Sequence, residues 1–323
     1  MACLKGAKGT VQDAPDFNDK EDAETLRHAM KGLGTDEDTI LKLLISRSNK
    51  QRQQIALTYK TLFGRDLTDD LKSELSGKFE TLLVALMVPA HLYDACELRN
   101  AIKGLGTLEN VIIEIMASRT AAEVKNIKET YKKEFDSDLE KDIVGDTSGN
   151  FERLLVSLVQ ANRDPVGKVD EGQVENDAKA LFDAGENKWG TDEETFISIL
   201  STRGVGHLRK VFDQYMTISG YQIEESIQSE TGGHFEKLLL AVVKSIRSIQ
   251  GYLAEVLYNS MKGAGTDDQT LIRVLVSRSE IDLFNIRQTF RKHYGKSLHA
   301  MIQSDTSGDY RNALLLLCGE IDD

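Results

Sequence analysis

Hydrophobic positions recur along this chain with the period of an α-helix. After each of four glycine-containing turns, apolar side chains follow at positions i, i+3 and i+4, which is typical of an amphipathic helix with one buried face. These positions are Ile40, Leu43 and Leu44; Ile112, Ile115 and Met116; Phe196, Ile199 and Leu200; and Leu271, Val274 and Leu275. Strand-like alternation is not sustained, and the turn signals leave room for four or five short helices per segment. The pattern predicts an all-α protein.

Two sequence blocks recur four times and define a repeating segment. The first contains Gly34, Gly106, Gly190 and Gly265, at intervals of 72, 84 and 75 residues, and the second contains a Ser-Gly or Gly-Gly turn followed by an apolar run. We predict a tail at 1–16 and four repeats at 17–88, 89–160, 161–247 with a linker, and 248–323. The linker Gln160–Gln173 is polar and contains glycine and proline, so we expect two halves hinged near Asp164.

A threonine follows the last glycine of each turn, where the N-cap of the next helix is expected. These residues are Thr35, Thr107, Thr191 and Thr266. Thr191 with Glu194 and Thr266 with Gln269 also fit the capping-box spacing, in which both side chains bond the backbone of the first turn. We therefore predict that the threonines cap these helices.

Composition narrows the class of protein. The 323 residues include 40 Lys and Arg against 52 Asp and Glu, and the resulting net charge of −12 argues against nucleic-acid binding. The three cysteines show no metal or redox spacing, which favours a reducing, cytosolic compartment. No secretory signal or membrane-spanning run is visible, so we expect any membrane role to be peripheral.

An acid stands 39 positions after each turn threonine, although the interval between repeats varies. These acids are Glu74, Asp146, Glu230 and Asp305, and each lies just before a Ser-Gly or Gly-Gly turn. Antiparallel helices would bring the two loops to one end of the repeat. Glycines allow positive φ and let carbonyls point into a shared concavity. Ca²⁺ accepts about 6–8 oxygen ligands at roughly 2.3–2.6 Å, whereas Mg²⁺ demands octahedral geometry, so the pattern favours calcium.

Other interpretations of these residues are weaker. A glycine after a helix is commonly a C-cap, and an acid near a turn is usually only solvated, so any one such turn favours a structural role. EF-hand, P-loop and dinucleotide motifs are missing from the sequence, and the six histidines share no metal-like spacing. Neither a serine nucleophile elbow nor a repeated catalytic carboxylate pair is present, so we do not expect an enzyme.

The K-G-x-G-T turns, the acids 39 positions later and the Ser-Arg pairs between them resemble the annexin family over residues 15–319. The resemblance implies four five-helix repeats that form a curved disc with calcium loops on its convex face. It implies three carbonyls and one carboxylate per site: Met30, Gly32, Gly34 and Glu74; Ile102, Gly104, Gly106 and Asp146; Gly185, Lys188, Gly190 and Glu230; and Met261, Gly263, Gly265 and Asp305. The third loop departs from the pattern because it is longer.

The resemblance also implies further contacts around these sites. A secondary calcium site would use Thr35 and Glu37, while Leu108 argues against one on Thr107 and Glu109 in the second repeat. The only tryptophan, Trp189, lies in the third loop and would touch lipid at the headgroup region, where tryptophan is enriched. The loop lysines that could meet lipid phosphates are Lys31, Lys103 and Lys262.

These features together predict calcium-dependent, reversible binding to membranes rich in anionic phospholipid such as phosphatidylserine. The family resemblance adds trimers and lattices on the bilayer, and shielding of procoagulant lipid, which would link the protein to blood coagulation. We expect the protein in the cytoplasm and at membranes when calcium rises, with an extracellular pool as a second setting. The alternative is a calcium-independent helical-repeat scaffold for protein partners.

Overall fold

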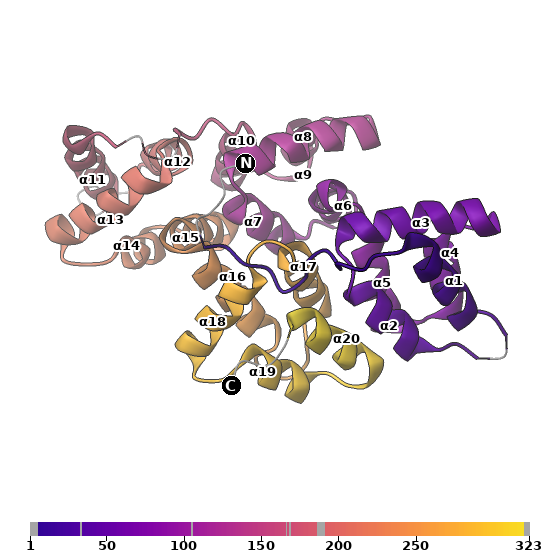
Figure 1. The fold of residues 1–323 in the computed structure, drawn as a ribbon. Coiled ribbons are helices and arrows are strands. Elements are labelled where there is room, and N and C mark those ends of the chain that lie inside the picture. The colour runs from indigo at the N-terminus through magenta and orange to yellow at the C-terminus, as the bar shows by residue number, and fades with distance from the viewer. Residues whose placement is uncertain are drawn as a thin grey trace. The chain divides into compact units, whose positions relative to one another are not determined.

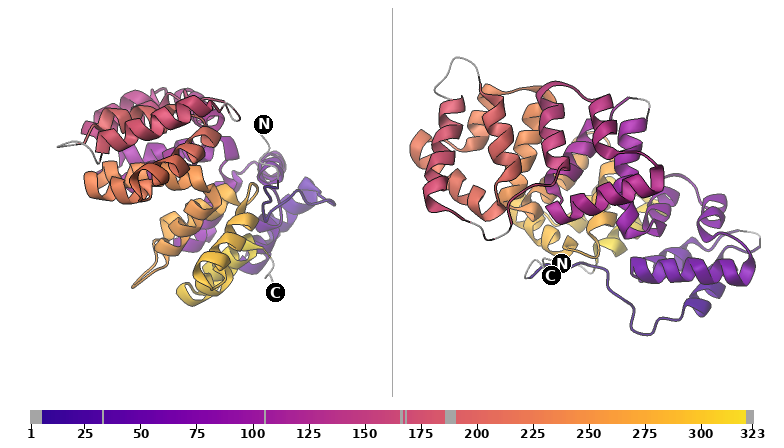
Figure 2. Two further views of the ribbon diagram at one scale, coloured as in Figure 1. Left: turned by 90° about the vertical axis from the view of Figure 1, so that its left-hand side faces the viewer. Right: turned by 90° about the horizontal axis from the view of Figure 1, so that it is seen from above.

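The computed structural model describes residues 6–32, 34–104, 106–165, 167, 169–185 and 191–319. Within these residues the regular structure consists of twenty α-helices (Figure 1). Two further views show the same helical architecture (Figure 2). The predicted all-α class is confirmed, with five helices for each of the four repeats. No helix in the described part of the chain is long and apolar enough to span a membrane.

Each repeat has the same order of helices, in which the fourth is the shortest. The first repeat contains α1 (Asp19–Ala29), α2 (Glu37–Ile45), α3 (Asn49–Phe63), α4 (Leu67–Glu74) and α5 (Gly77–Met87). The second contains α6 (Ala90–Lys103), α7 (Glu109–Ser118), α8 (Ala121–Phe135), α9 (Leu139–Asp146) and α10 (Gly149–Val159). The third contains α11 (Glu171–Gly185), α12 (Glu193–Thr202), α13 (Val205–Ser219), α14 (Ile223–Glu230) and α15 (Gly233–Arg247). The fourth contains α16 (Ile249–Ser260), α17 (Asp268–Arg278), α18 (Leu283–Tyr294), α19 (Leu298–Asp305) and α20 (Gly308–Cys318).

Aspartates, not the predicted threonines, cap the second helix of three repeats. The side chains of Asp36, Asp192 and Asp267 accept hydrogen bonds from the backbone N–H groups of Thr39, Thr195 and Thr270. The prediction of threonine caps is therefore wrong by one residue. An aspartate at this position reaches the third N–H of the helix, which leaves the preceding threonine hydroxyl for another partner. In α7 the cap position holds Leu108, and no side chain caps that helix.

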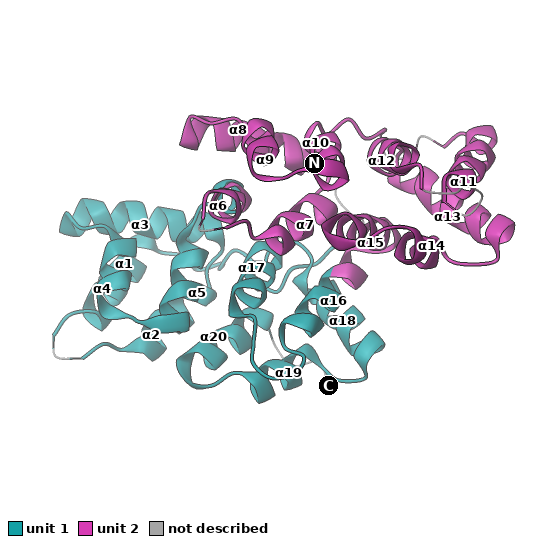
Figure 3. Ribbon diagram, turned by 180° about the vertical axis from the view of Figure 1, so that it is seen from behind, with its two compact units in different colours: residues 1–93, 253–323 teal, residues 94–252 magenta. Residues whose placement is uncertain are grey.

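The chain forms two compact units, which Figure 3 distinguishes by colour. One contains Met1–Tyr93 and Leu253–Asp323, and the other contains Asp94–Tyr252. The prediction of two halves hinged near Asp164 is wrong, because the linker lies inside the second unit. There the backbone N–H of Asp164 donates to the carbonyl of Thr202 over 2.7 Å. Glycine and proline mark this segment as a turn, but α10 packs against α12 and α15 across it.

The first unit joins the first and fourth repeats. Helix α5 packs against α17 and α20, and α2 packs against α20. Leu44, Leu86, Leu275 and Leu317 are among its fully buried side chains. Burying each such side chain contributes about 1.5–3 kcal/mol, so this apolar contact is the main source of stability between the two repeats.

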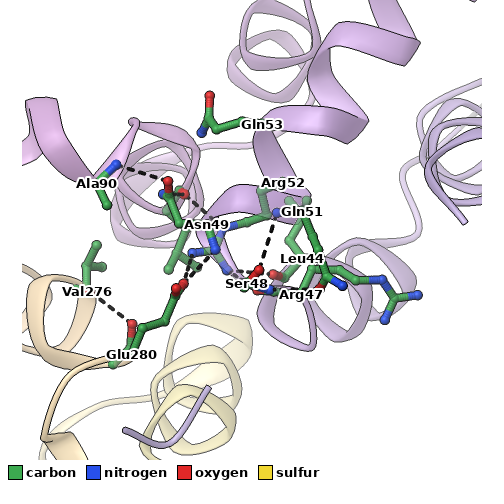
Figure 4. Close-up of polar contacts among 12 residues, drawn as sticks. Leu44, Arg47, Ser48, Asn49, Gln51, Arg52, Gln53, Ala90, Val276 and Glu280 are labelled. Carbon is green, nitrogen blue, oxygen red and sulfur yellow. Dashed lines mark hydrogen bonds and ion pairs between the residues drawn. The ribbon is translucent and has the colours of Figure 1, made fainter. Parts of the chain in front are cut away.

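A buried arginine adds a polar connection inside the first unit (Figure 4). Arg52 is only 2% exposed, and its guanidinium donates to the carbonyls of Leu86 at 2.9 Å and Leu44 at 3.1 Å. Its second terminal nitrogen lies 3.4 Å from Oε1 of Glu280, an acid of the fourth repeat. Burial lowers the pKa of Arg52 to about 10, and the Glu280 carboxylate partly opposes that shift. The charge is thus held by helix-end carbonyls and one acid.

The second unit joins the second and third repeats by packing α15 against α7 and α10. Ile112, Ile115, Leu154 and Leu239 are fully buried in this unit. These contacts resemble those of the first unit, in which α5 occupies the position of α15 and α17 that of α7. In both units, therefore, the fifth helix of one repeat lies against the second helix of the other.

Candidate calcium-binding loops

The turn between the first and second helices is closed in every repeat by one backbone hydrogen bond. The N–H of the residue after the threonine donates to a carbonyl near the end of the first helix. The pairs are Asp36 to Ala29 at 2.9 Å, Leu108 to Ala101 at 3.0 Å, Asp192 to Ala184 at 2.8 Å and Asp267 to Ser260 at 2.7 Å. The third loop is one residue longer than the others. Each loop is therefore a ring closed at its base.

Glycines give the first and fourth loops their shape. Gly32 and Gly34 have φ values of 120° and 97°, and Gly263 and Gly265 have 105° and 95°. Residues with a Cβ rarely adopt this region. A Cβ at any of these positions would meet nothing within 4 Å, so the backbone and not crowding requires glycine. The open space leaves the loop backbone accessible to a ligand.

The start of each of these loops is anchored in the core. Met30, Ile102 and Met261 are 4%, 3% and 3% exposed, although their backbones enter the loops. The apolar side chain at this position fixes where the loop leaves its helix. Gly104 and Gly106 follow Ile102 at the exposed end of α6, and Gly106 has a positive φ of 86°.

The turn threonine and the acid 39 positions later are in contact in all four repeats. Each threonine hydroxyl donates to the acid: Thr35 to Glu74 Oε2 at 2.9 Å, Thr107 to Asp146 Oδ2 at 2.7 Å, Thr191 to the Glu230 carbonyl at 2.9 Å, and Thr266 to Asp305 Oδ2. Helix packing thus brings the two loops to one end of each repeat. The sequence interpretation missed this role of the threonines, although their constant distance from the acids was its signal.

Each of the four acids is the last residue of the short fourth helix: Glu74 of α4, Asp146 of α9, Glu230 of α14 and Asp305 of α19. Glu74 and Asp146 are exposed, while Glu230 and Asp305 are partly buried. A glycine with positive φ then begins the fifth helix; in the first repeat it is Gly77, with φ 62°. This sharp turn leaves the acid at the mouth of the loop and not along a helix face.

The third loop is only partly described. Gly185 ends α11, and a Cβ there would lie 3.8 Å from Cγ of Glu230, so this glycine and the acid are neighbours. Lys188, Trp189 and Gly190 lie outside the described residues.

The predicted secondary pair, Thr35 and Glu37, belongs to the first loop. Thr35 bonds Glu74, and Glu37 is the first residue of α2 and is partly buried.

The donor groups at these loops are oxygens. No group of three or more His, Cys, Asp or Glu side chains lies together in the part of the chain that the structure describes. A soft metal that needs several nitrogen or sulfur ligands has no such cluster there. A loop of accessible carbonyls beside one carboxylate suits a hard cation, and Ca²⁺ tolerates the irregular geometry that Mg²⁺ does not. The residues present therefore fit calcium.

The three loop lysines have different surroundings. Lys31 is exposed at the first loop. The ammonium of Lys103 lies 2.9 Å from Oδ1 of Asp142, and that of Lys262 lies 5.6 Å from the centre of the Tyr258 ring. A lysine held by an acid of its own repeat is less available to a lipid phosphate. The lysines are therefore not equivalent.

Known proteins resemble this chain over nearly its whole length. The annexin family profile matches four segments, residues 21–86, 93–158, 176–242 and 252–317. Bovine annexin A5 is 68% identical over 316 residues, which cover 98% of each chain. The solved structure of chicken annexin V has a TM-score of 0.93 and 67% identity, covering 97% of this chain and 99% of the other. A calcium-bound annexin (Sm)1 has a TM-score of 0.84 and 36% identity, covering 98% and 94%.

Four five-helix repeats, each with a closed loop beside a carboxylate, define the class as a helical-repeat protein that presents oxygen ligands at its surface. The four matches to the family profile identify the family within this class. The chain belongs to the annexin family. Calcium is the metal of that family, and calcium-dependent binding to phospholipid membranes is its general property.

Proposed function

We propose that this protein binds membranes rich in anionic phospholipid, such as phosphatidylserine, reversibly and through calcium held at its four loop pairs. The proposed ligands are the three carbonyls and one carboxylate named for each repeat, with Thr35 and Glu37 as a secondary site. The proposal includes association into trimers and lattices on the bilayer and shielding of procoagulant lipid. It places the protein in the cytoplasm and at membranes when calcium rises, with an extracellular pool as a second setting.

The observation that carries the proposal is the contact between each turn threonine and its acid. Thr107 and Asp146, for example, are 39 residues apart and bonded at 2.7 Å. The carboxylate accepts the corresponding bond in the first, second and fourth repeats. In the third, Thr191 bonds the Glu230 carbonyl at 2.9 Å and lies 3.4 Å from its Oε2, so an acid stays beside the turn threonine in every repeat. A hydroxyl that bonds one oxygen of a carboxylate fixes its orientation and leaves the second oxygen for another partner.

The residues of each loop pair have separate tasks in this mechanism. Apolar anchors such as Met30 hold the loop at the surface, glycines turn its carbonyls outward, and the threonine orients the carboxylate. Bound calcium supplies positive charge whose remaining coordination positions accept lipid phosphoryl oxygens. Four ions add eight positive charges, so the formal net charge of −12 would become −4 and repulsion from an anionic bilayer would fall.

One carboxylate per site implies weak calcium binding without lipid, because affinity follows the number of charged ligands. Several weak sites on one molecule then combine, since each contact after the first is effectively intramolecular. The proposal thus accounts for attachment that is firm at high calcium and is reversed by a chelator. It assigns no catalytic role to these residues.

The test is co-sedimentation with vesicles of phosphatidylserine and phosphatidylcholine across a calcium titration, followed by excess chelator. We expect binding that saturates with calcium and is released by the chelator. Glu74→Gln and Asp305→Asn should each raise the calcium concentration at half-maximal binding. Glu129→Gln removes the same charge from the exposed surface of α8 and should leave that concentration unchanged.

The rival function, a calcium-independent scaffold, makes the opposite prediction. It expects no vesicle binding at any calcium concentration, and partners that stay attached in chelator. Vesicle binding that persists in chelator, or Glu74→Gln and Glu129→Gln variants with the same titration midpoint, would contradict the proposed sites.

A further inference from the structure

A salt bridge in the first unit connects the loop pair of the first repeat to that of the fourth. Lys78 is the second residue of α5 and lies four positions after Glu74. Its ammonium forms an ion pair with Oδ2 of Asp268, the first residue of α17. Asp268 lies two positions after Thr266, which bonds Asp305. The ion pair thus joins a residue four positions after Glu74 to one two positions after Thr266, whose hydroxyl bonds Asp305.

The second unit contains the same connection at the equivalent positions. His234 lies four positions after Glu230, and its Nδ1 is 3.4 Å from Oε1 of Glu109. Glu109 is the first residue of α7 and lies two positions after Thr107. The His234 ring also makes an edge contact with Phe151, with ring centres 5.6 Å apart and planes at 87°. The turn of the third repeat therefore reaches the loop of the second.

The repetition of this link has a structural cause. Helix α5 packs on α17, and α15 packs on α7, so the start of each fifth helix faces the start of a second helix. Asp268 is only 15% exposed and Glu109 33%, so both acids are sheltered by the neighbouring repeat. Burial and the adjacent Asp268 carboxylate raise the pKa of Tyr310, the first-turn aromatic residue of α20. Asp268 is thus enclosed between a tyrosine and a lysine.

The acids Glu109 and Asp268 stand at a position that recurs in the repeats. Glu109 and Asp268 occupy the position that holds Glu37 in the first repeat, the proposed secondary calcium ligand. In the fourth repeat Lys78 of the first repeat lies beside that acid, and in the second repeat the His234 ring of the third repeat does. The salt bridge is partly exposed, and such pairs contribute little to the stability of a fold. We therefore expect the Lys78–Asp268 pair to affect the position of the fourth-repeat loop and not the stability of the fold.

We propose that Lys78 and His234 are positioning residues that couple the proposed calcium sites in pairs, the first repeat with the fourth and the third with the second. This inference rests on the proposed function, because it takes the loop pairs as the sites. Ligation by Glu74 shifts the turn at 75–77, and Lys78 transmits that shift to the start of α17 and to Thr266. His234 does the same for α7 and Thr107.

A double-mutant cycle tests the coupling. The calcium concentration at half-maximal binding to phosphatidylserine–phosphatidylcholine vesicles is measured for Glu74→Gln, Asp305→Asn and the double variant, with and without Lys78→Met. Each variant multiplies this calcium concentration by some factor. We expect the factor for the double variant to differ by at least about threefold from the product of the two single factors. Lys78→Met should abolish that difference. Lys78→Arg keeps the cation and should restore it.

Two comparisons separate this coupling from general avidity. The double variant Glu74→Gln with Glu230→Gln changes sites in different units. Its difference from the product of the single effects is the reference, because only shared membrane attachment can produce it. Glu230→Gln with Asp146→Asn should exceed that reference, and His234→Gln should remove the excess. Single variants without effect would refute the proposed function. Single effects whose combinations never exceed the reference would refute only the coupling.

A second measurement does not involve calcium or lipid. Hydrogen exchange of the amides at the start of α17 is followed in chelator for the unmodified chain, Lys78→Met and the control Lys60→Met, which changes an exposed lysine of α3. We expect faster exchange, by at least about threefold, in Lys78→Met alone, and the same at the start of α7 in His234→Gln. Unchanged exchange in both variants would overturn the positioning role. Circular dichroism checks that each variant is folded.

Discussion

Lys103 places its ammonium nitrogen 2.9 Å from Oδ1 of Asp142, within the second repeat. Asp142 also accepts hydrogen bonds from Tyr131 at 2.8 Å and Ser137 at 2.7 Å. The loop lysine that the family resemblance assigns to lipid phosphate thus has a protein partner in this structure. Burial raises the pKa of Asp142, but the bonds from Lys103, Ser137 and Tyr131 outweigh burial and lower that pKa to about 2.

This lowered pKa predicts a loss of stability in acid. A carboxyl group whose folded pKa lies below its unfolded value stabilises the fold above the unfolded value, and that contribution disappears as the pH falls through the folded value. We expect Asp142→Asn to melt at a lower temperature than the unmodified chain at pH 6. The difference should shrink between pH of about 4 and 2. A difference that is constant across this range would contradict the assignment, and melting curves at each pH measure it.

Leu108 predicts a stabilising substitution. It stands at the cap position of α7, where the other repeats have Asp36, Asp192 and Asp267, and it is 45% exposed. Leu108→Asp should supply the missing cap and raise the free energy of unfolding by about 1 kcal/mol. Urea denaturation measures the change. Leu108→Ala is the control, because it removes the exposed leucine without adding a cap; equal stability of the two variants would show that no cap forms.

The buried Arg52 predicts an asymmetric effect of its two kinds of partner. Arg52→Met removes a donor from the carbonyls of Leu44, Arg47 and Leu86. Among the described residues only Leu86 keeps a second donor, Asn49 Nδ2 at 3.3 Å, and an unsatisfied buried polar group costs about 1–3 kcal/mol. We therefore expect a loss of about 3 kcal/mol in the free energy of unfolding. Glu280→Gln keeps a hydrogen-bond acceptor beside Arg52 and should cost less. Denaturant titration compares the two, and a larger loss for Glu280→Gln would mean that the ion pair and not the carbonyls holds Arg52.

The positive φ of Gly34 predicts that a methyl group there is costly. The left-handed region disfavours a residue with a Cβ by about 1–2 kcal/mol, so Gly34→Ala should destabilise the fold by about 1 kcal/mol or distort the loop. We expect weaker calcium-dependent vesicle binding in either case. Gly145→Ala is the matched control, since Gly145 lies in α9 and a Cβ there meets nothing within 4 Å. It should be neutral or stabilising, and equal binding by both variants would argue against the role of the loop.

The sequence predicted the candidate site better than it predicted the details of each loop. The constant spacing of Thr107 and Asp146 identified two residues that the structure joins at 2.7 Å. It did not reveal which group each threonine bonds, because threonine is both a good helix cap and a good partner for a carboxylate. The packing of the fourth helix beside the loop decides between these roles, because Thr107 bonds Asp146 although Leu108 and not an aspartate follows it.

The arrangement of repeats was equally hidden. A polar linker at Gln160–Gln173 has the composition of a hinge, yet it lies within one compact unit. Two side-chain pairs join different repeats: Lys78 with Asp268, and His234 with Glu109. The repeat pattern in the sequence does not show which repeats are joined. Ion pairs of this kind carry no signal in one sequence, since any exposed lysine and acid could form them.

The sequence by itself determined the helical class, the four repeats with four or five helices each, and the recurring partnership of a glycine turn with an acid. These follow from periodicity and spacing, which are local properties of the chain. Only the tertiary structure decided which repeats share a core, where each charged side chain finds its partner and which loop lysine is paired with an acid. Those outcomes depend on how apolar faces of distant helices pack, and packing is a property of surfaces that come together only when the chain is folded.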